Sequence, residues 1–178
     1  MTDNSIAAIK DRFNDEGAAR YGDLIAAAEP DFDRQAYLKT ARDGLEALAL
    51  RGRAQHIAKA LRNHLPHTFD DVCHVLLRAV GDPPSADGDE GMGSFDNLPF
   101  LDVVELFGHE DPGAALDALE QLTRHFSGEW AIRPLILQHY DLAMVRIRDW
   151  STHADWRVRR LASEGTRPRL PWGIQLKP

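Results

Sequence analysis

The spacing of apolar residues constrains the fold more than any other feature of this 178-residue chain. Apolar side chains recur every three or four residues along most of the sequence, for example over residues 33–49 and 53–65. This is the period of a helix that buries one face. No alternation of apolar and polar residues of strand length stands out. The sequence therefore predicts an all-α fold built from helices of about 10–17 residues.

Capping residues predict where several helices begin and end. Thr68 is a suitable N-cap for a helix that ends at Gly81, and Asp111 is one for a helix with Pro112 at its first position. Three further helices are expected over residues 129–139, 141–150 and 154–164. Pro134 falls inside the first of them, where we expect it to kink the helix.

Short turns between these helices favour antiparallel helical pairs. Residues 112–139 and 141–164 are similar to two neighbouring HEAT-like repeats, whose period is about 40 residues. Stacked pairs of this kind form an α-solenoid with a curved surface, here an incomplete superhelix. An irregular all-α bundle is the alternative.

An acidic segment divides the helical pattern. Residues 81–94, GDPPSADGDEGMGS, are rich in glycine, proline and acidic side chains and predict a mobile linker. We expect an N-terminal helical region over residues 1–80, this linker, and HEAT-like repeats with a basic C-terminal loop over residues 95–178.

The net charge of −7 hides an uneven distribution. Residues 1–145 carry 13 basic and 25 acidic side chains, whereas residues 146–178 carry 8 basic and 3 acidic ones. An acidic body with a basic end indicates an anionic partner at that end. A solubilising surface with charges clustered by chance is the alternative.

Other signals bear on location and cofactors. The single cysteine, Cys73, has no partner for an internal disulfide, and no apolar run approaches the roughly 18 residues of a membrane span. Without a visible secretion signal, a cytoplasmic location is expected. The eight histidines lack metal-ligand spacing, and no glycine-rich phosphate loop or nucleophile elbow occurs. We therefore expect no metal and no small-molecule cofactor.

Two motifs carry a resemblance to a known family. The segments EWAIRPLI (129–136) and VRRLASEGTRPRLPWG (158–173) resemble the AlkC/AlkD-type DNA alkylation-repair family of HEAT-like repeat glycosylases, and the match is closer to the AlkC branch. The resemblance covers residues 60–173. It implies hydrolysis of the N-glycosidic bond of a cationic N-alkylated base, such as 3-methyladenine, in double-stranded DNA. For a bacterium, it implies a cytoplasmic, nucleoid-associated protein.

The resemblance assigns the chemistry to Glu129. Departure of an alkylated base leaves an oxocarbenium-like sugar, and a carboxylate near C1′ stabilises its charge and orients the attacking water. The alternative is a glutamate that interacts with a helix dipole. Trp172, in a rigid Leu-Pro-Trp-Gly context, is expected to contact the lesion or its deoxyribose, or alternatively to close the end of the core.

Arginines are expected to bind the DNA backbone, because guanidinium groups suit bidentate phosphate contacts. The candidates are Arg160, Arg167 and Arg169, followed by Arg157 and Arg159.

Two further residues are expected to support the site. Arg133 matches the family motif, or pairs with Glu129 one helical turn away. Glu164 is expected to order the arginine loop through a salt bridge, with a role at the lesion as the alternative.

Relatives in this family continue through further helical repeats that complete the DNA groove and supply a second acidic residue. We therefore expect a shortened member of the family, or one that assembles with a partner chain that supplies the missing repeats. A non-catalytic DNA-binding module and a protein-interaction module are the alternative functions.

Overall fold

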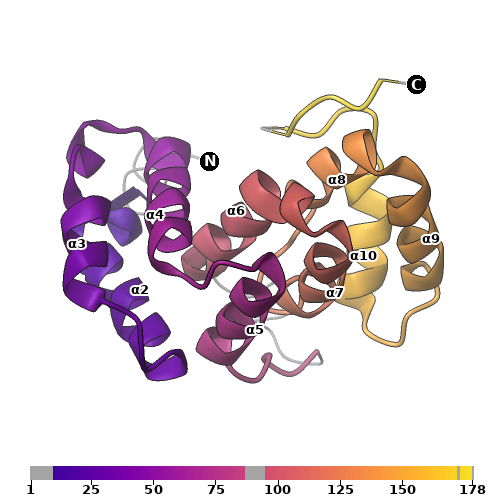
Figure 1. The fold of residues 1–178 in the computed structure, drawn as a ribbon. Coiled ribbons are helices and arrows are strands. Elements are labelled where there is room, and N and C mark those ends of the chain that lie inside the picture. The colour runs from indigo at the N-terminus through magenta and orange to yellow at the C-terminus, as the bar shows by residue number, and fades with distance from the viewer. Residues whose placement is uncertain (1–9, 87–94, 172, 178) are drawn as a thin grey trace.

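The computed structural model describes residues 10–86, 95–171 and 173–177, and within them it contains helices and short 3₁₀ turns but no β-strand (Figure 1). The predicted all-α fold is confirmed. None of the described helices is long and apolar enough to cross a membrane.

The helices are α2 (Asp15–Ala28), α3 (Arg34–Arg42), α4 (Leu50–His64), α5 (Phe69–Val80), α6 (Leu98–Phe107), α7 (Pro112–Leu122), α8 (Ile132–Gln138), α9 (Tyr140–Trp150) and α10 (Trp156–Gly165). The 3₁₀ turns are η1 (Asp11–Phe13), η2 (Leu45–Ala47), η3 (Phe95–Asn97) and η4 (Gly108–Glu110).

The helices pack into one elongated body (Figure 1). Helices α2, α3 and α4 lie at one end, and α8, α9 and α10 lie at the other (Figure 1). Extensive contacts of α4 with α6 and of α5 with α7 join the two halves. Buried apolar residues from both halves form a single core. The described residues of the regions 1–80 and 95–178 therefore pack together.

The predicted helix boundaries at capping residues are confirmed. The side chain of Thr68 accepts the backbone N–H of Asp71 at 3.3 Å, and that of Asp111 accepts the N–H of Ala114 at 3.1 Å. Gly81 ends α5 with φ +67°, a conformation that glycine adopts without steric cost.

Two predicted helices differ in the structure. Residues 33–49 do not form one helix, because α3 ends at Arg42 and Gly44 turns the chain with φ +73°. Helix α8 begins only at Ile132, so Pro134 is its third residue. A proline in the first helical turn removes no helical hydrogen bond, because N–H groups there have no acceptor within the helix. The reason for the predicted kink at Pro134 is therefore absent.

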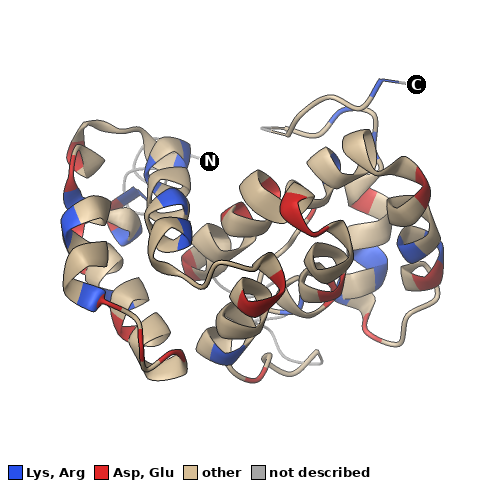
Figure 2. Cartoon of the chain, viewed as in Figure 1, with Lys and Arg blue, Asp and Glu red and all other residues tan. Residues whose placement is uncertain are grey.

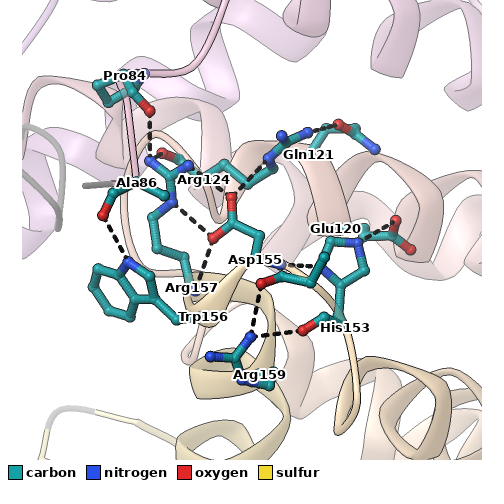
Figure 3. Close-up of polar contacts among 11 residues, drawn as sticks. Pro84, Ala86, Glu120, Gln121, Arg124, His153, Asp155, Trp156, Arg157 and Arg159 are labelled. Carbon is teal, nitrogen blue, oxygen red and sulfur yellow. Dashed lines mark hydrogen bonds and ion pairs between the residues drawn. The ribbon is translucent and has the colours of Figure 1, made fainter. Parts of the chain in front are cut away.

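The start of the acidic segment lies against α10. The carbonyl oxygen of Pro84 accepts a hydrogen bond from Arg157 at 2.9 Å, and that of Ala86 accepts one from Trp156 at 3.1 Å (Figure 3). These two hydrogen bonds attach residues 84–86 to α10, within the segment for which the sequence predicts a mobile linker. Residues 87–94 of that prediction lie outside the described part of the chain.

Candidate functional site

Glu129 lies in the turn between α7 and α8, and only 6% of its surface is exposed. The hydroxyl of Thr123 accepts the backbone N–H of Gly128 at 3.2 Å across this turn. A β-carbon at Gly128 would lie 2.7 Å from the end of the Leu119 side chain, so the turn packs closely on α7. The backbone on which Glu129 sits is therefore held firmly.

Two side chains hold the Glu129 carboxylate. Its Oε2 accepts hydrogen bonds from the Ser127 hydroxyl at 2.7 Å and from Arg160 Nη1 at 2.5 Å. Arg160 Nη1 also donates to the Ser127 hydroxyl at 2.5 Å. Both bonds to the carboxylate fall on Oε2, and no contact of Oε1 is seen within the described residues. This arrangement fixes the carboxylate through its Oε2.

Arg160 has a different partner from the one that the sequence predicts. A buried carboxylate is costly unless it is paired, and Arg160 of α10 supplies the compensating charge. The sequence assigned Arg160 to a DNA phosphate instead. The sequence analysis also did not predict Ser127. Its position, two residues before Glu129, could have suggested that its hydroxyl binds the carboxylate.

A shallow pocket reaches this cluster between the turn and α10. It is lined by Thr123, Ser127, Trp156, Arg157 and Arg160. Its lining includes both residues that hold Glu129.

The end of α10 packs against the same turn at Gly165. A β-carbon at Gly165 would lie 2.6 Å from the Ile132 side chain and 3.8 Å from the Glu129 carbonyl oxygen. Glu164 forms the salt bridge to the arginine loop that the sequence predicts, with Arg167 as its partner at 2.8 Å.

Arg133 holds the chain that follows α10. Its side chain is fully buried and donates to four backbone carbonyls, at Gly165 (3.0 Å), Arg167 (2.8 Å), Pro168 (3.2 Å) and Ile174 (2.5 Å). Burial lowers the pKa of Arg133 from its usual value. The alternative pairing of Arg133 with Glu129 is wrong, because its acceptors are the last residue of α10 and three residues beyond that helix.

The remaining predicted phosphate ligands divide into two groups. Arg159, Arg167 and Arg169 are exposed. Arg159 donates to the carbonyls of His153 and Ala154 at 2.7 and 2.8 Å, which anchors its side chain beside the turn before α10 (Figure 3). Residues 166–177, here called the C-terminal segment, contain basic but no acidic side chains (Figure 2).

Arg157, in contrast, is buried, and protein groups occupy its guanidinium (Figure 3). It binds both carboxylate oxygens of Asp155, at 3.0 and 2.7 Å, and the carbonyls of Pro84 and Arg124, at 2.9 and 2.8 Å. These hydrogen bonds hold the pKa of Asp155 well below its usual range. The prediction that Arg157 binds a phosphate is therefore not retained.

Trp172 lies outside the described residues, so its predicted contact with the lesion stays a prediction. The adjacent Pro171 accepts a hydrogen bond from the Trp130 indole at 3.0 Å, which ties the C-terminal segment to the turn that carries Glu129. Trp150 is buried in the core.

Among the residues that the structure describes, no three histidine, cysteine or acidic side chains are grouped as a metal site would require. The site therefore consists of a buried carboxylate held by Ser127 and Arg160, next to a basic segment.

These features define a class of protein: an all-α stack of helices with an arginine-bound carboxylate beside an arginine-rich segment. No family model matches the chain. It is 31% identical over 169 residues to the uncharacterized protein YhaZ of Bacillus subtilis, covering 94% of this chain and 45% of YhaZ. It is similar in structure to the Pseudomonas fluorescens alkylpurine DNA glycosylase AlkC bound to DNA containing an abasic site analog, with a TM-score of 0.77 and 29% identity over 94% of this chain and 45% of that one.

The chain thus resembles an AlkC-type glycosylase in both sequence and fold. This confirms the resemblance carried by the two motifs. The chain spans less than half the length of the two relatives that it matches.

Proposed function

We propose that the chain binds DNA and hydrolyses the N-glycosidic bond of cationic N-alkylated purines such as 3-methyladenine. The observation that carries this proposal is the buried Glu129 carboxylate, fixed through Oε2 by Ser127 and Arg160. The similarity of the chain to an alkylpurine DNA glycosylase that was solved bound to DNA supports it.

The chemistry suits a carboxylate without a strong acid. Alkylation already gives the base a positive charge, so the bond between C1′ and the base nitrogen breaks with its electron pair going to the base. The sugar left behind is oxocarbenium-like, and an anionic carboxylate stabilises it. A water molecule then adds its oxygen to C1′ and loses a proton, which gives an abasic site and a neutral free base. In this proposal Glu129 Oε1 faces the sugar and orients that water.

We assign the phosphate contacts to Arg159, Arg167 and Arg169, which are exposed. Arg160 is assigned to Glu129 instead, and Glu164 orders the segment through Arg167. The proposed partner is double-stranded DNA with an alkylated base, so the protein would act where the chromosome lies.

A non-catalytic DNA-binding module is the second candidate. One observation favours it: the ion pair between Glu129 and Arg160 satisfies both charges and would also suit a purely structural role.

Release of free base from N-methylated DNA separates these two functions. The chain is incubated in excess with methylated and with unmethylated duplex, and the free bases are separated by chromatography. We expect release of 3-methyladenine above the spontaneous rate from the methylated duplex only. DNA binding without release would instead support the binding module and contradict the enzymatic proposal.

A further inference from the structure

Trp130 lies where three parts of the molecule meet. It directly follows Glu129, and its indole N–H donates to the carbonyl oxygen of Pro171 at 3.0 Å. Its ring stacks on that of Phe126, with the ring centroids 6.2 Å apart. Together with Arg51 of α4, it also lines a small pocket. One half-buried side chain thus lies between the turn that carries Glu129, the C-terminal segment and the N-terminal half of the chain.

The hydrogen bond from Trp130 holds a stretch of the C-terminal segment that Arg133 does not hold. Arg133 binds the carbonyls on either side of residues 169–173, at Pro168 and Ile174. In the part of the chain that the structure describes, residues 169–173 make one hydrogen bond to the rest of the molecule, the one from Trp130. Their other backbone hydrogen bond joins two residues of the same stretch. Hydrogen bonding therefore fixes the position of this stretch through Trp130.

This stretch carries a proposed phosphate contact, and the turn carries the proposed catalytic carboxylate. Arg169 lies two residues before Pro171, and Glu129 lies one residue before Trp130. The hydrogen bond therefore joins the two functional side chains by a short path. Hydrolysis needs C1′ of the bound DNA at a fixed position relative to the carboxylate, and a misplacement of about 1 Å costs about 100-fold in rate. The stretch that binds the DNA backbone must therefore be held in register with Glu129.

We propose that Trp130 is a positioning residue of the reaction. Its N–H keeps the phosphate-binding stretch in register with the Glu129 carboxylate, while Phe126 fixes the plane of its ring. The inference rests on the proposed glycosylase function. The role requires the indole N–H, because phenylalanine at this position could stack on Phe126 but has no donor.

Trp130→Phe tests this role, because it removes the donor and keeps an aromatic ring against Phe126. With saturating methylated duplex, single-turnover release of 3-methyladenine should slow about tenfold, while DNA affinity changes less than about threefold. Trp150→Phe is the matched control. Its indole donates to Glu120 at 2.7 Å, outside the C-terminal segment, so release should keep the wild-type rate. Circular dichroism checks that both variants are folded.

A side chain that only packs would affect stability without slowing the chemistry of bound DNA. A wild-type rate of release in Trp130→Phe, or an equal slowing by both variants, would therefore overturn the proposal.

Hydrogen exchange in the free protein tests the anchor without the reaction. Deuterium uptake by peptides that cover residues 169–173 should rise several-fold in Trp130→Phe and stay unchanged in Trp150→Phe. Unchanged uptake in Trp130→Phe would overturn the anchor, whatever the activity. Raised uptake together with no base release by the wild type would contradict the proposed function, and with it the role of Trp130 in the reaction, but not the anchor.

Discussion

Arg157 is a buried charge that is compensated entirely by protein groups. Each of its guanidinium nitrogens donates to Asp155 or to a backbone carbonyl. Such a group stabilises a fold only as part of its complete set of partners, because removing one partner leaves the other buried and unpaired. Arg157 joins α7, α10 and the start of the acidic segment, so its loss affects three parts of the chain.

Arg157→Ala is expected to lower the free energy of unfolding by about 3–5 kcal/mol, because it leaves the buried Asp155 carboxylate without its main partner. Urea denaturation followed by circular dichroism measures this change. Arg159→Ala is the matched control. It removes an exposed arginine two residues away and should change stability by less than about 0.5 kcal/mol. Equal midpoints for the two variants would contradict the structural role of Arg157.

The sequence did not predict which side chains pair with each other around Glu129. Helical spacing suggested that Arg133 pairs with Glu129, but α8 begins at Ile132, so Glu129 lies outside that helix. Arg160 becomes the partner because tertiary packing brings α10 to the turn. Which side chains form ion pairs thus depends on where a helix begins and on contacts between residues distant in sequence. The spacing of residues along the chain predicts neither.

At the scale of elements, the described residues of the C-terminal segment form neither a helix nor a strand. Its backbone is held instead by the Arg133 guanidinium and by the Trp130 indole. Gly165 and Gly173 both lie against neighbouring side chains, where a β-carbon would be crowded. The position of the exposed arginines in this segment therefore depends on α8.

Arg133→Gln should release this segment, because it removes most of the donors that hold its carbonyls. Trypsin would then cleave after Arg169 several-fold faster than in the wild type, which mass spectrometry of the fragments detects. Arg78→Gln removes an exposed arginine from α5 and should leave that cleavage rate unchanged. An equal rate in Arg133→Gln and the wild type would show that the segment is held in some other way.

At the contact between α4 and α6, two carboxylates share a single guanidinium group. Arg51 of α4 binds both Asp102 and Glu105 of α6, so one guanidinium serves two carboxylates. Within the described structure, Oδ2 of Asp102 is buried without a hydrogen-bond partner. Burial is the main reason that the pKa of Asp102 is raised to about 7.

This shift predicts a pH dependence of stability. An aspartate in the unfolded chain has a pKa of about 3.9, so between that value and about pH 7 the folded state binds more protons than the unfolded state. The Asp102 contribution to stability should therefore fall as pH rises through this window and level off above it. In urea denaturation at several pH values, the free energy of unfolding should fall less steeply with rising pH for Asp102→Asn than for the wild type. A stability difference between the variant and the wild type that is independent of pH would contradict the raised pKa.

Helix boundaries were predictable where a local signal fixes them. Thr68, Gly81 and Asp111 act through their own side chain or backbone, and the structure confirms all three. The prediction of one helix over residues 33–49 was wrong. The helical spacing of apolar residues continues across Gly44, but the backbone at Gly44 has a positive φ that ends the helix. The docking of residues 81–86 was not predictable, because it depends on Trp156 and Arg157, about 70 residues later.

At the scale of the whole molecule, the all-α class followed from the apolar period alone and is confirmed by the structure. The division between an acidic body and a basic end persists in three dimensions, because the basic C-terminal segment lies at one end of the stack (Figure 2). Binding of an anionic polymer responds to such a local surface, so a net charge of −7 is compatible with DNA as the partner.

The salt dependence of DNA binding tests this charge distribution. Each phosphate contact contributes about 0.9 to the slope of log affinity against log salt concentration. Arg167→Ala with Arg169→Ala should therefore reduce the slope by about 2, measured by fluorescence anisotropy. Lys39→Ala removes an exposed basic side chain from α3 and should leave the slope unchanged. If the double variant has the wild-type slope, these arginines do not contact phosphates in the proposed interface.

The central claim is that the Glu129 carboxylate stabilises the sugar cation. Its most direct test is single-turnover release of 3-methyladenine from methylated duplex by the wild type and by Glu129→Gln, with DNA affinity measured in parallel. Glutamine keeps the shape of the side chain but removes its negative charge, so we expect release to slow by about 100-fold or more while affinity changes little. Equal rates of base release in the two proteins would contradict the claim.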